Sequence, residues 1–130
     1  MAIILVIEDH EVALSLCKVM LGEKHKIIEA RNSDLALDLL KECKPDLIIA
    51  DLMVPNSTGS FPKSSEAVKL IDTLHTSDSQ VKILVYSVLC YEPHIQKQAF
   101  DFGASACLLK MGNVEIFRQT VNSLLGLEQN

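Results

Sequence analysis

Five short apolar runs, each followed by a stretch with helical spacing, constrain the fold of this chain more than any other feature. The runs cover residues 3–7, 26–30, 47–50, 83–86 and 106–109. Four of them are rich in β-branched residues or leucine and show little alternation, which is typical of strands covered on both faces. Strands that alternate with helices in this way predict a parallel sheet built from βαβ units.

The helix boundaries follow from capping residues, glycines and prolines in the intervening segments. The expected starts are a cap at Asp9, then Asn32 with Ser33, about Ser65, Pro93, and a cap at Asn113. The expected ends are Gly22, a position before Pro45, and Gly103.

Apolar residues at helical spacing indicate which face of each helix packs on the sheet. In chain order these residues are Val12, Leu16, Val19 and Met20; Leu35, Leu39 and Leu40; Val68, Leu70, Ile71 and Leu74; Ile95, Ala99 and Phe102; and Ile116, Phe117, Val121, Leu124 and Leu125.

Right-handed crossovers and coverage of both sheet faces leave few arrangements for five βα units. The common one is a doubly wound, flavodoxin-like (βα)5 fold of the α/β class, with a five-stranded parallel sheet in the order 2-1-3-4-5. At 130 residues, with 48% hydrophobic and 22% charged residues, the chain has the size and composition of one globular domain. We therefore expect residues 1–130 to form a single domain with no room for an output domain.

Charge and hydropathy exclude several classes of function. The net charge of -5 would repel a phosphate backbone, so we expect no direct contact with nucleic acid. The first apolar run lacks a basic segment before it and ends at Glu8 and Asp9, unlike a signal peptide, and no run approaches membrane-spanning length. We expect a cytoplasmic protein with no membrane contact. The cysteines form no CxxC pair and are expected to be reduced, and the histidines show no ligand spacing.

Polar residues follow four of the five predicted strands. Glu8 and Asp9 end the first strand, Asp51 the third, Ser87 the fourth and Lys110 the fifth. The first and third strands are neighbours in the predicted order, so three carboxylates would crowd one edge of the sheet. Such crowding is costly unless a cation is present, and hard oxygen ligands suit Mg²⁺. Asp51 would then be placed to accept a phosphoryl group, with Lys110 and Ser87 contacting its oxygens.

Four sequence motifs resemble those of the receiver domains of two-component response regulators. They are VIED at 6–9, DLIIADLMVP at 46–55 followed by Gly59, ILVYS at 83–87, and FGASACLLK at 102–110. Together they are highly specific, and the resemblance extends over essentially the whole chain. It implies a phosphoacceptor switch rather than an enzyme, with a sensor histidine kinase or phosphotransfer protein and a downstream protein target as partners.

The resemblance also assigns roles to individual residues. Asp51 is the phosphoacceptor, Ser87 the hydroxyl position and Lys110 the essential lysine. The implied Mg²⁺ ligands are the acidic pair Glu8 and Asp9, Asp51, and the backbone carbonyl of Met53.

Three positions depart from the family pattern. Receivers usually have proline where this chain has Met111, often have Tyr or Phe where it has Cys107, and commonly have a small residue where it has Val88. A cis bond before a non-proline residue costs about 2.5–4 kcal/mol, so we predict a trans Lys110–Met111 bond. The chain is also several residues longer than usual near 60–65. We predict that segment 55–65 is a mobile loop with few anchoring side chains.

Other functions that this fold could support fit the residues less well. An FMN binder would need a phosphate-binding loop where Glu8, Asp9 and His10 stand, and an aspartyl phosphatase would need a second acid at Met53. The remaining alternative is a receiver-like module that signals by protein contacts without phosphorylation. Incubation with Mg²⁺ and a small phosphodonor would separate it from a phosphoacceptor.

Overall fold

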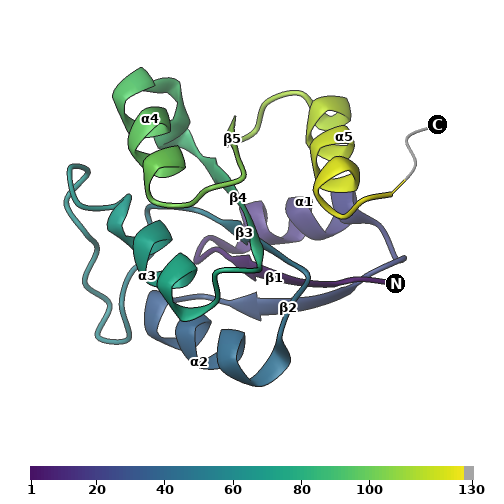
Figure 1. The fold of residues 1–130 in the computed structure, drawn as a ribbon, viewed down its shortest axis with the longest axis horizontal. Coiled ribbons are helices and arrows are strands. Elements are labelled where there is room, and N and C mark those ends of the chain that lie inside the picture. The colour runs from purple at the N-terminus through teal and green to yellow at the C-terminus, as the bar shows by residue number, and fades with distance from the viewer. Residues whose placement is uncertain (128–130) are drawn as a thin grey trace.

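The computed structural model describes residues 1–127 and contains a parallel sheet in the order β2-β1-β3-β4-β5 (Figure 1). The elements are β1 (Ile3–Ile7), α1 (Glu11–Leu21), β2 (Lys26–Ala30), α2 (Ser33–Cys43), β3 (Leu47–Ala50), α3 (Lys69–Ser77), β4 (Lys82–Ser87), the 3-10 helix η1 (Val88–Tyr91), α4 (Pro93–Asp101), β5 (Ala106–Leu109) and α5 (Val114–Leu124). The predicted doubly wound fold and strand order are confirmed.

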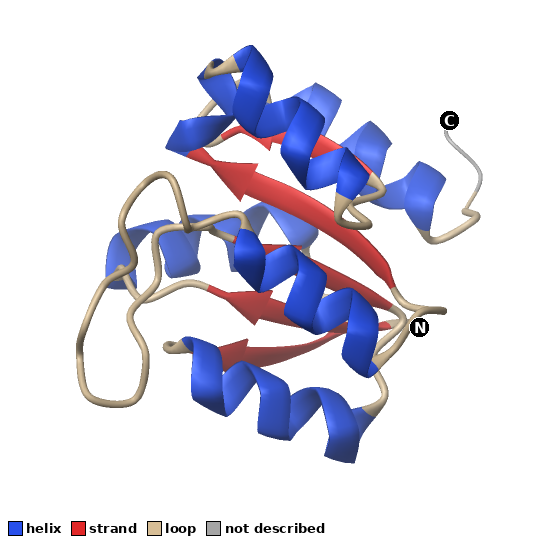
Figure 2. Cartoon of the chain, turned by 60° about the vertical axis from the view of Figure 1, so that its left-hand side comes forward, coloured by secondary structure: helices blue, strands red, loops and turns tan. Residues whose placement is uncertain are grey.

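Helices cover both faces of the sheet (Figure 2). Helices α2, α3 and α4 contribute to one buried apolar cluster, which includes Ile71 and Leu74. Helices α1 and α5 contribute to a second cluster on the opposite face, built around Phe117 and Val121. This double coverage explains the unbroken apolar runs, because every residue of β3 is buried.

The strand bounds match the predicted runs, apart from β4. That strand extends one residue further at each end, from Lys82 to Ser87. Lys82 pairs with Leu47 of β3, and Ser87 pairs with Leu109 of β5. Ser87 therefore lies at the carboxyl edge of the sheet, as expected.

Two of the three predicted side-chain caps are present. The side-chain oxygen of Asn32 accepts a hydrogen bond from the backbone N–H of Leu35 at 2.7 Å, and that of Asn113 accepts one from Ile116 N–H at 2.9 Å. The predicted cap at Asp9 is wrong. Helix α1 begins later, with His10 at the N-cap position and no side-chain cap. The Asp9 carboxylate lies instead with two other acidic side chains at the sheet edge.

Loss of the α2 cap should destabilise the domain measurably. We expect Asn32→Ala to lower the free energy of unfolding by about 1 kcal/mol, because the Leu35 N–H would lose its acceptor. Asn32→Asp is the matched control, since a carboxylate also accepts this bond and suits a helix N-terminus. Urea denaturation of both variants checks the prediction; equal losses in the two would contradict a capping role.

Three of the four residues predicted for the buried face of α1 are exposed, whereas Met20 packs against the core as predicted. Val12 and Val19 are 60% and 71% exposed, and Leu16 is also exposed, whereas Leu14 and Cys17 are buried. Helix α1 is apolar on more than one side, so the sequence offers two stripes at helical spacing. Packing of α1 against β1 and α5 selects the stripe that contains Leu14 and Cys17.

The faces predicted for α2 and α5 are confirmed apart from one residue in each. Leu35 and Ile116 are exposed, while their chain neighbours Ala36 and Phe117 are buried. Both exposed residues donate their backbone N–H to a capping asparagine and so lie in the first helical turn. The predicted faces of α3 and α4 pack against the core as expected.

Helix α3 begins later than the predicted Ser65. Residues 64–68 form turns, and the α-helix starts at Lys69. Bonds from Glu66 N–H to Lys63 O at 2.8 Å and from Lys69 N–H to Glu66 O at 3.1 Å join residues three apart. This spacing is that of 3-10 turns rather than of an α-helix.

Hydrogen bonds from two side chains anchor the turn at the start of segment 55–65. The side-chain oxygen of Asn56 accepts bonds from the N–H groups of Thr58 and Ser60, and the Asp34 carboxylate of α2 accepts a 2.8 Å bond from Ser57 N–H. Two polar side chains, Asn56 within the segment and Asp34 of α2, therefore hold the backbone of the turn. Phe61 remains exposed. The mobility of the segment stays a prediction.

The peptide bond between Lys110 and Met111 is trans, as predicted. Met111 adopts a left-handed backbone conformation with φ 65°, and its N–H donates to the Tyr86 hydroxyl at 3.0 Å. That bond ties the segment after β5 to the end of β4. Within residues 1–127, no helix combines the length and the apolar character that crossing a bilayer demands.

Candidate functional site

The candidate site lies at the carboxyl edge of the sheet, where the ends of β1, β3, β4 and β5 meet. Glu8 and Asp9 follow β1, and Asp51 follows β3. Strands β1 and β3 are neighbours with Ile7 opposite Ala50, and Asp51 N–H donates to Ile7 O at 3.0 Å. This register places Glu8 and Asp51 side by side.

Three acidic side chains converge at this edge, as the sequence predicts. One carboxylate oxygen from each of Glu8, Asp9 and Asp51 lies within 4.8 Å of the other two. Glu8 and Asp51 are buried, and Asp9 is half-buried. Burial of like charges so close together is unfavourable unless a proton, a cationic side chain or a metal ion compensates.

Lys110 provides part of that compensation. Its ammonium group forms ion pairs with Glu8 and with Asp51, the second at 2.9 Å. Strand β5 is separated from β3 by β4, so the Lys110 side chain reaches across the end of β4 to meet Asp51. The Lys110 backbone N–H donates to Ser87 O at 3.2 Å, which fixes the backbone from which the Lys110 side chain extends.

Glu8, Asp51 and Lys110 shift one another's pKa. Burial, and then the hydrogen bond with Asp51, raises the pKa of Glu8 to about 7. Burial also acts to raise the pKa of Asp51, but hydrogen bonds with Glu8, Lys110 and the Met53 N–H outweigh it and hold that pKa below its usual value. The two ion pairs outweigh burial at Lys110 and raise its pKa. Both shifts favour the charged forms, a carboxylate at Asp51 and an ammonium at Lys110.

Ser87 is fully buried at the end of β4, next to the acidic cluster in strand order. Its hydroxyl oxygen accepts a hydrogen bond from the Leu89 N–H at 3.3 Å, within the first turn of η1. A hydroxyl that accepts one bond can still donate its own proton. The structure thus places Ser87 at the predicted edge, with its hydroxyl engaged by η1 rather than by the carboxylates.

The donor set fits a hard divalent cation. The oxygens of Glu8, Asp9 and Asp51 are the carboxylate ligands that Mg²⁺ prefers. One Glu8 oxygen, Oε2, is buried and has no hydrogen-bond partner among the described residues. A buried carboxylate oxygen without a partner is unusual, and a cation would satisfy it. Met53 lies close by, since its N–H donates to Asp51 Oδ1 at 3.1 Å.

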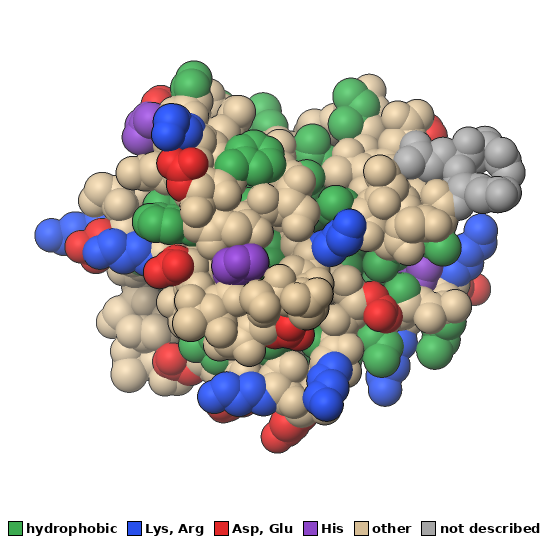
Figure 3. All heavy atoms as spheres, in the orientation of Figure 1, with side chains coloured by type: hydrophobic (Ala, Val, Ile, Leu, Met, Phe, Trp, Pro, Cys, Tyr) green, Lys and Arg blue, Asp and Glu red, His purple; other side chains and the backbone are tan. Residues whose placement is uncertain are grey.

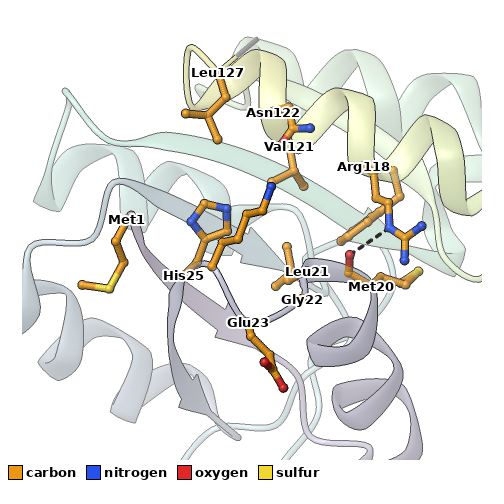
Figure 4. A pocket seen from close by; sticks show the side chains of 12 residues that line it. Met1, Met20, Leu21, Gly22, Glu23, His25, Arg118, Val121, Asn122 and Leu127 are labelled. Atoms are coloured by element: carbon orange, nitrogen blue, oxygen red, sulfur yellow. Dashed lines mark hydrogen bonds between the residues drawn. The ribbon is translucent and has the colours of Figure 1, made fainter. Parts of the chain in front are cut away.

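The hollow beneath the acidic cluster is too small to hold an organic cofactor such as FMN. A hollow of about 10 Å³ lies beneath the acidic cluster, lined by Glu8, Asp51 and Lys110 among others. A far larger hollow, of about 570 Å³, lies between the carboxyl ends of α1 and α5, lined by Met20 and Arg118 among others (Figure 4). It adjoins the amino-terminal edge of the sheet, so it is remote from the carboxylates.

Comparison with known protein families identifies the chain. A family model described as the response regulator receiver domain matches residues 4–122. The chain belongs to this family. A solved receiver domain, that of the Francisella response regulator 1452, superimposes with a TM-score of 0.81 over 97% of this chain and 98% of that one, at 20% identity. This structural similarity to a receiver domain agrees with the fold and strand order described above.

Two curated relatives are substantially longer than this chain. Histidine kinase P4 of Formosa agariphila is 31% identical over 123 residues, which cover 94% of this chain and 8% of that protein. Transcriptional regulatory protein YdfI of Bacillus subtilis is 30% identical over 126 residues, which cover 94% of this chain and 54% of that protein. The chain therefore spans a small part of the first and about half of the second.

Two features of the site were not predicted from the sequence. The Tyr86 hydroxyl positions the Met111 backbone, and η1 holds the Ser87 hydroxyl through Leu89. The first could have been suspected from a tyrosine within an otherwise aliphatic strand, because a buried tyrosine hydroxyl usually finds a partner. No sequence signal marks the second.

Proposed function

We propose that this receiver domain accepts a phosphoryl group on Asp51, with Mg²⁺ bound by Glu8, Asp9, Asp51 and the Met53 carbonyl. The observation that supports the proposal best is the Asp51 carboxylate, buried beside two further carboxylates and paired with Lys110. An ion pair that served only stability would gain nothing from three crowded acids. A site that binds a divalent cation and accepts a phosphoryl group, in contrast, uses these carboxylates as metal ligands and as the acceptor.

The residues of the site divide the chemistry between them. Met53 N–H holds Asp51 Oδ1 and Lys110 holds Oδ2, so the carboxylate is oriented before a donor arrives. An Asp51 oxygen attacks the donor phosphorus, and the bond from phosphorus to the leaving group breaks as the acyl phosphate forms. Lys110 stabilises charge on the phosphoryl oxygens, and the Ser87 hydroxyl donates to one of them. When bound, Mg²⁺ supplies positive charge that offsets the clustered anions.

The proposed partners follow from this chemistry. The donor is a sensor histidine kinase or a phosphotransfer protein, and the phosphorylated domain acts on a downstream protein as a switch rather than as an enzyme. Similarity to part of a histidine kinase supports a place in a phosphorelay, which we expect to operate in the cytoplasm. The net charge of -5 disfavours direct contact with nucleic acid, and the face in Figure 3 shows basic side chains interspersed with acidic ones.

Phosphate incorporation from a small acyl phosphate tests the proposal. Intact-mass measurement after incubation with Mg²⁺ should show one added phosphoryl group, removed by hydroxylamine and absent when a chelator replaces Mg²⁺. A phosphorylation-independent module would show no such addition, either from small donors or from a panel of histidine kinases. That result would contradict the proposal.

Asp9→Asn should weaken Mg²⁺ binding without unfolding the domain. Asp9 is the most exposed of the three acids, and its side chain does not cap helix α1. Removal of one carboxylate ligand should raise severalfold the Mg²⁺ concentration needed for half-maximal phosphorylation. Maximal phosphorylation at saturating Mg²⁺ should be retained. An unchanged Mg²⁺ dependence would exclude Asp9 as a ligand.

A further inference from the structure

Two cysteine side chains meet beside the site. Cys90 lies in η1 and Cys107 lies in β5, and their Sγ atoms are 2.6 Å apart. The bonded distance in a disulfide is about 2.05 Å, so a small movement would join them. Cys90 is buried, whereas Cys107 is half-buried. All four cysteines of the chain are free thiols in this structure.

The protein holds both thiols in place from several directions. Cys107 is the register partner of Val85 in β4, and the Cys90 thiol donates to the Val85 carbonyl at 3.8 Å. The side-chain amide of Gln96, in α4, donates to the Cys90 carbonyl. Helix η1 packs against β5 as well as against α4. The two sulfur atoms are thus brought together by secondary structure rather than by flexible loops.

We propose that Cys90 and Cys107 are a modification site, at which a peroxide forms a reversible intramolecular disulfide. The Cys107 thiol loses its proton and attacks a peroxide oxygen; the O–O bond breaks, and a sulfenic acid and hydroxide form. The Cys90 thiolate then attacks the Cys107 sulfur and displaces a second hydroxide. The two thiol protons convert both hydroxides to water, so two thiols and one hydrogen peroxide yield one disulfide and two waters.

The surroundings of the two sulfur atoms expose Cys107 to the oxidant and favour the thiolate of Cys90. Cys107 is the more exposed of the pair, so an oxidant from solvent reaches it first. The hydrogen bond from Cys107 lowers the pKa of Cys90, although burial opposes this effect. The same bond, together with burial, raises the pKa of Cys107, which disfavours the thiolate that the first step requires and makes that step the slower of the two. Cys90 therefore favours the thiolate form that the second step requires.

The disulfide would connect the segments that carry two site residues. Cys90 lies three residues after Ser87, and Cys107 lies three residues before Lys110. The bond would fasten η1, whose Leu89 N–H holds the Ser87 hydroxyl, to the strand that positions Lys110. An effect on phosphorylation would rest on the function proposed above, whereas formation of the disulfide would not.

Peptide mapping after oxidation tests the site. The full chain is treated with hydrogen peroxide at neutral pH, unfolded in a thiol-blocking reagent and digested without reduction. We expect a peptide containing Cys90 joined to one containing Cys107, with the loss of two hydrogen masses and recovery of both thiols in dithiothreitol. Cys17, in α1, and Cys43, in α2, are internal controls that should stay alkylatable, because among the described residues neither contacts a second thiol.

Matched variants complete the test. Cys17→Ala combined with Cys43→Ala should retain the linked peptide, whereas Cys107→Ala and the volume-filling Cys107→Val should lose it. Oxidation should also raise the melting temperature of the wild type by roughly 10 °C, reversibly, and leave the Cys107 variants unchanged. Over-oxidation of Cys107 without a link, or links only between separate molecules, would overturn the proposal. Each readout is independent of phosphorylation.

Discussion

Asp51→Asn is expected to abolish acyl phosphate formation on this chain. The substitution replaces the nucleophilic carboxylate oxygen with an amide, which does not attack phosphorus at a useful rate. The shape of the side chain is preserved, and the asparagine oxygen can still accept the bond from the Met53 N–H. Loss of phosphorylation would therefore report lost chemistry rather than a lost fold. Phosphate incorporation is measured by intact-mass analysis, with a small acyl phosphate as donor and separately with a competent histidine kinase.

Asp46→Asn is the matched control for this experiment. Asp46 immediately precedes β3, at the opposite end of the strand from Asp51, and its carboxylate accepts a bond from Ile3 N–H at 2.8 Å. This variant should incorporate phosphate as the wild type does. Hydroxylamine-labile phosphate that persists in Asp51→Asn, mapped to another aspartate, would refute the assignment. Denaturation curves of both variants exclude unfolding as the cause.

The topology was predictable because its determinants are local and repeated. A central strand is apolar over its covered length, since helices cover both of its faces, and β3 and residues 83–86 of β4 show this in the sequence. The order of the strands then follows from crossover handedness. The convergence of Glu8, Asp9 and Asp51 was predictable for the same reason, because the carboxyl ends of parallel strands share one edge.

The errors arose where one local pattern allowed two outcomes. Helix α1 has apolar residues on several sides, and only its packing against the sheet and α5 selects Leu14 and Cys17 over Val12 and Val19. Segment 64–68 has a sequence compatible with a helix, yet it forms turns with bonds between residues three apart. In both cases tertiary contacts decide between alternatives that are locally similar.

The cysteine pair lay beyond sequence reasoning for a different reason. Cys90 and Cys107 belong to different elements, and their contact depends on the short helix η1, which no periodic pattern announces. The departure from the family pattern at position 107 was visible in the sequence. Its consequence, a thiol facing a second thiol, required the placement of η1 against β5.

The lifetime of the phosphorylated form should depend on Met53 and Leu89, the positions two residues after Asp51 and two after Ser87. Hydrolysis of an acyl phosphate requires a water molecule in line with the phosphorus. Both side chains are apolar, half-buried and packed against the larger core cluster, so neither can hold that water by a hydrogen bond. Val88 is 53% exposed and adds bulk beside Ser87. We therefore expect slow dephosphorylation.

Polar substitutions at these two positions should accelerate the decay. A hydrogen bond that positions the water in the transition state is worth about 1 kcal/mol, so Met53→Asn and Leu89→Glu combined should speed decay by roughly 30-fold. Met53→Leu combined with Leu89→Met is the apolar control and should leave the rate unchanged. The measurement is loss of the phosphorylated mass over time in excess Mg²⁺, after removal of the donor. Equal decay rates in the polar and apolar double variants would show that these side chains do not control the lifetime.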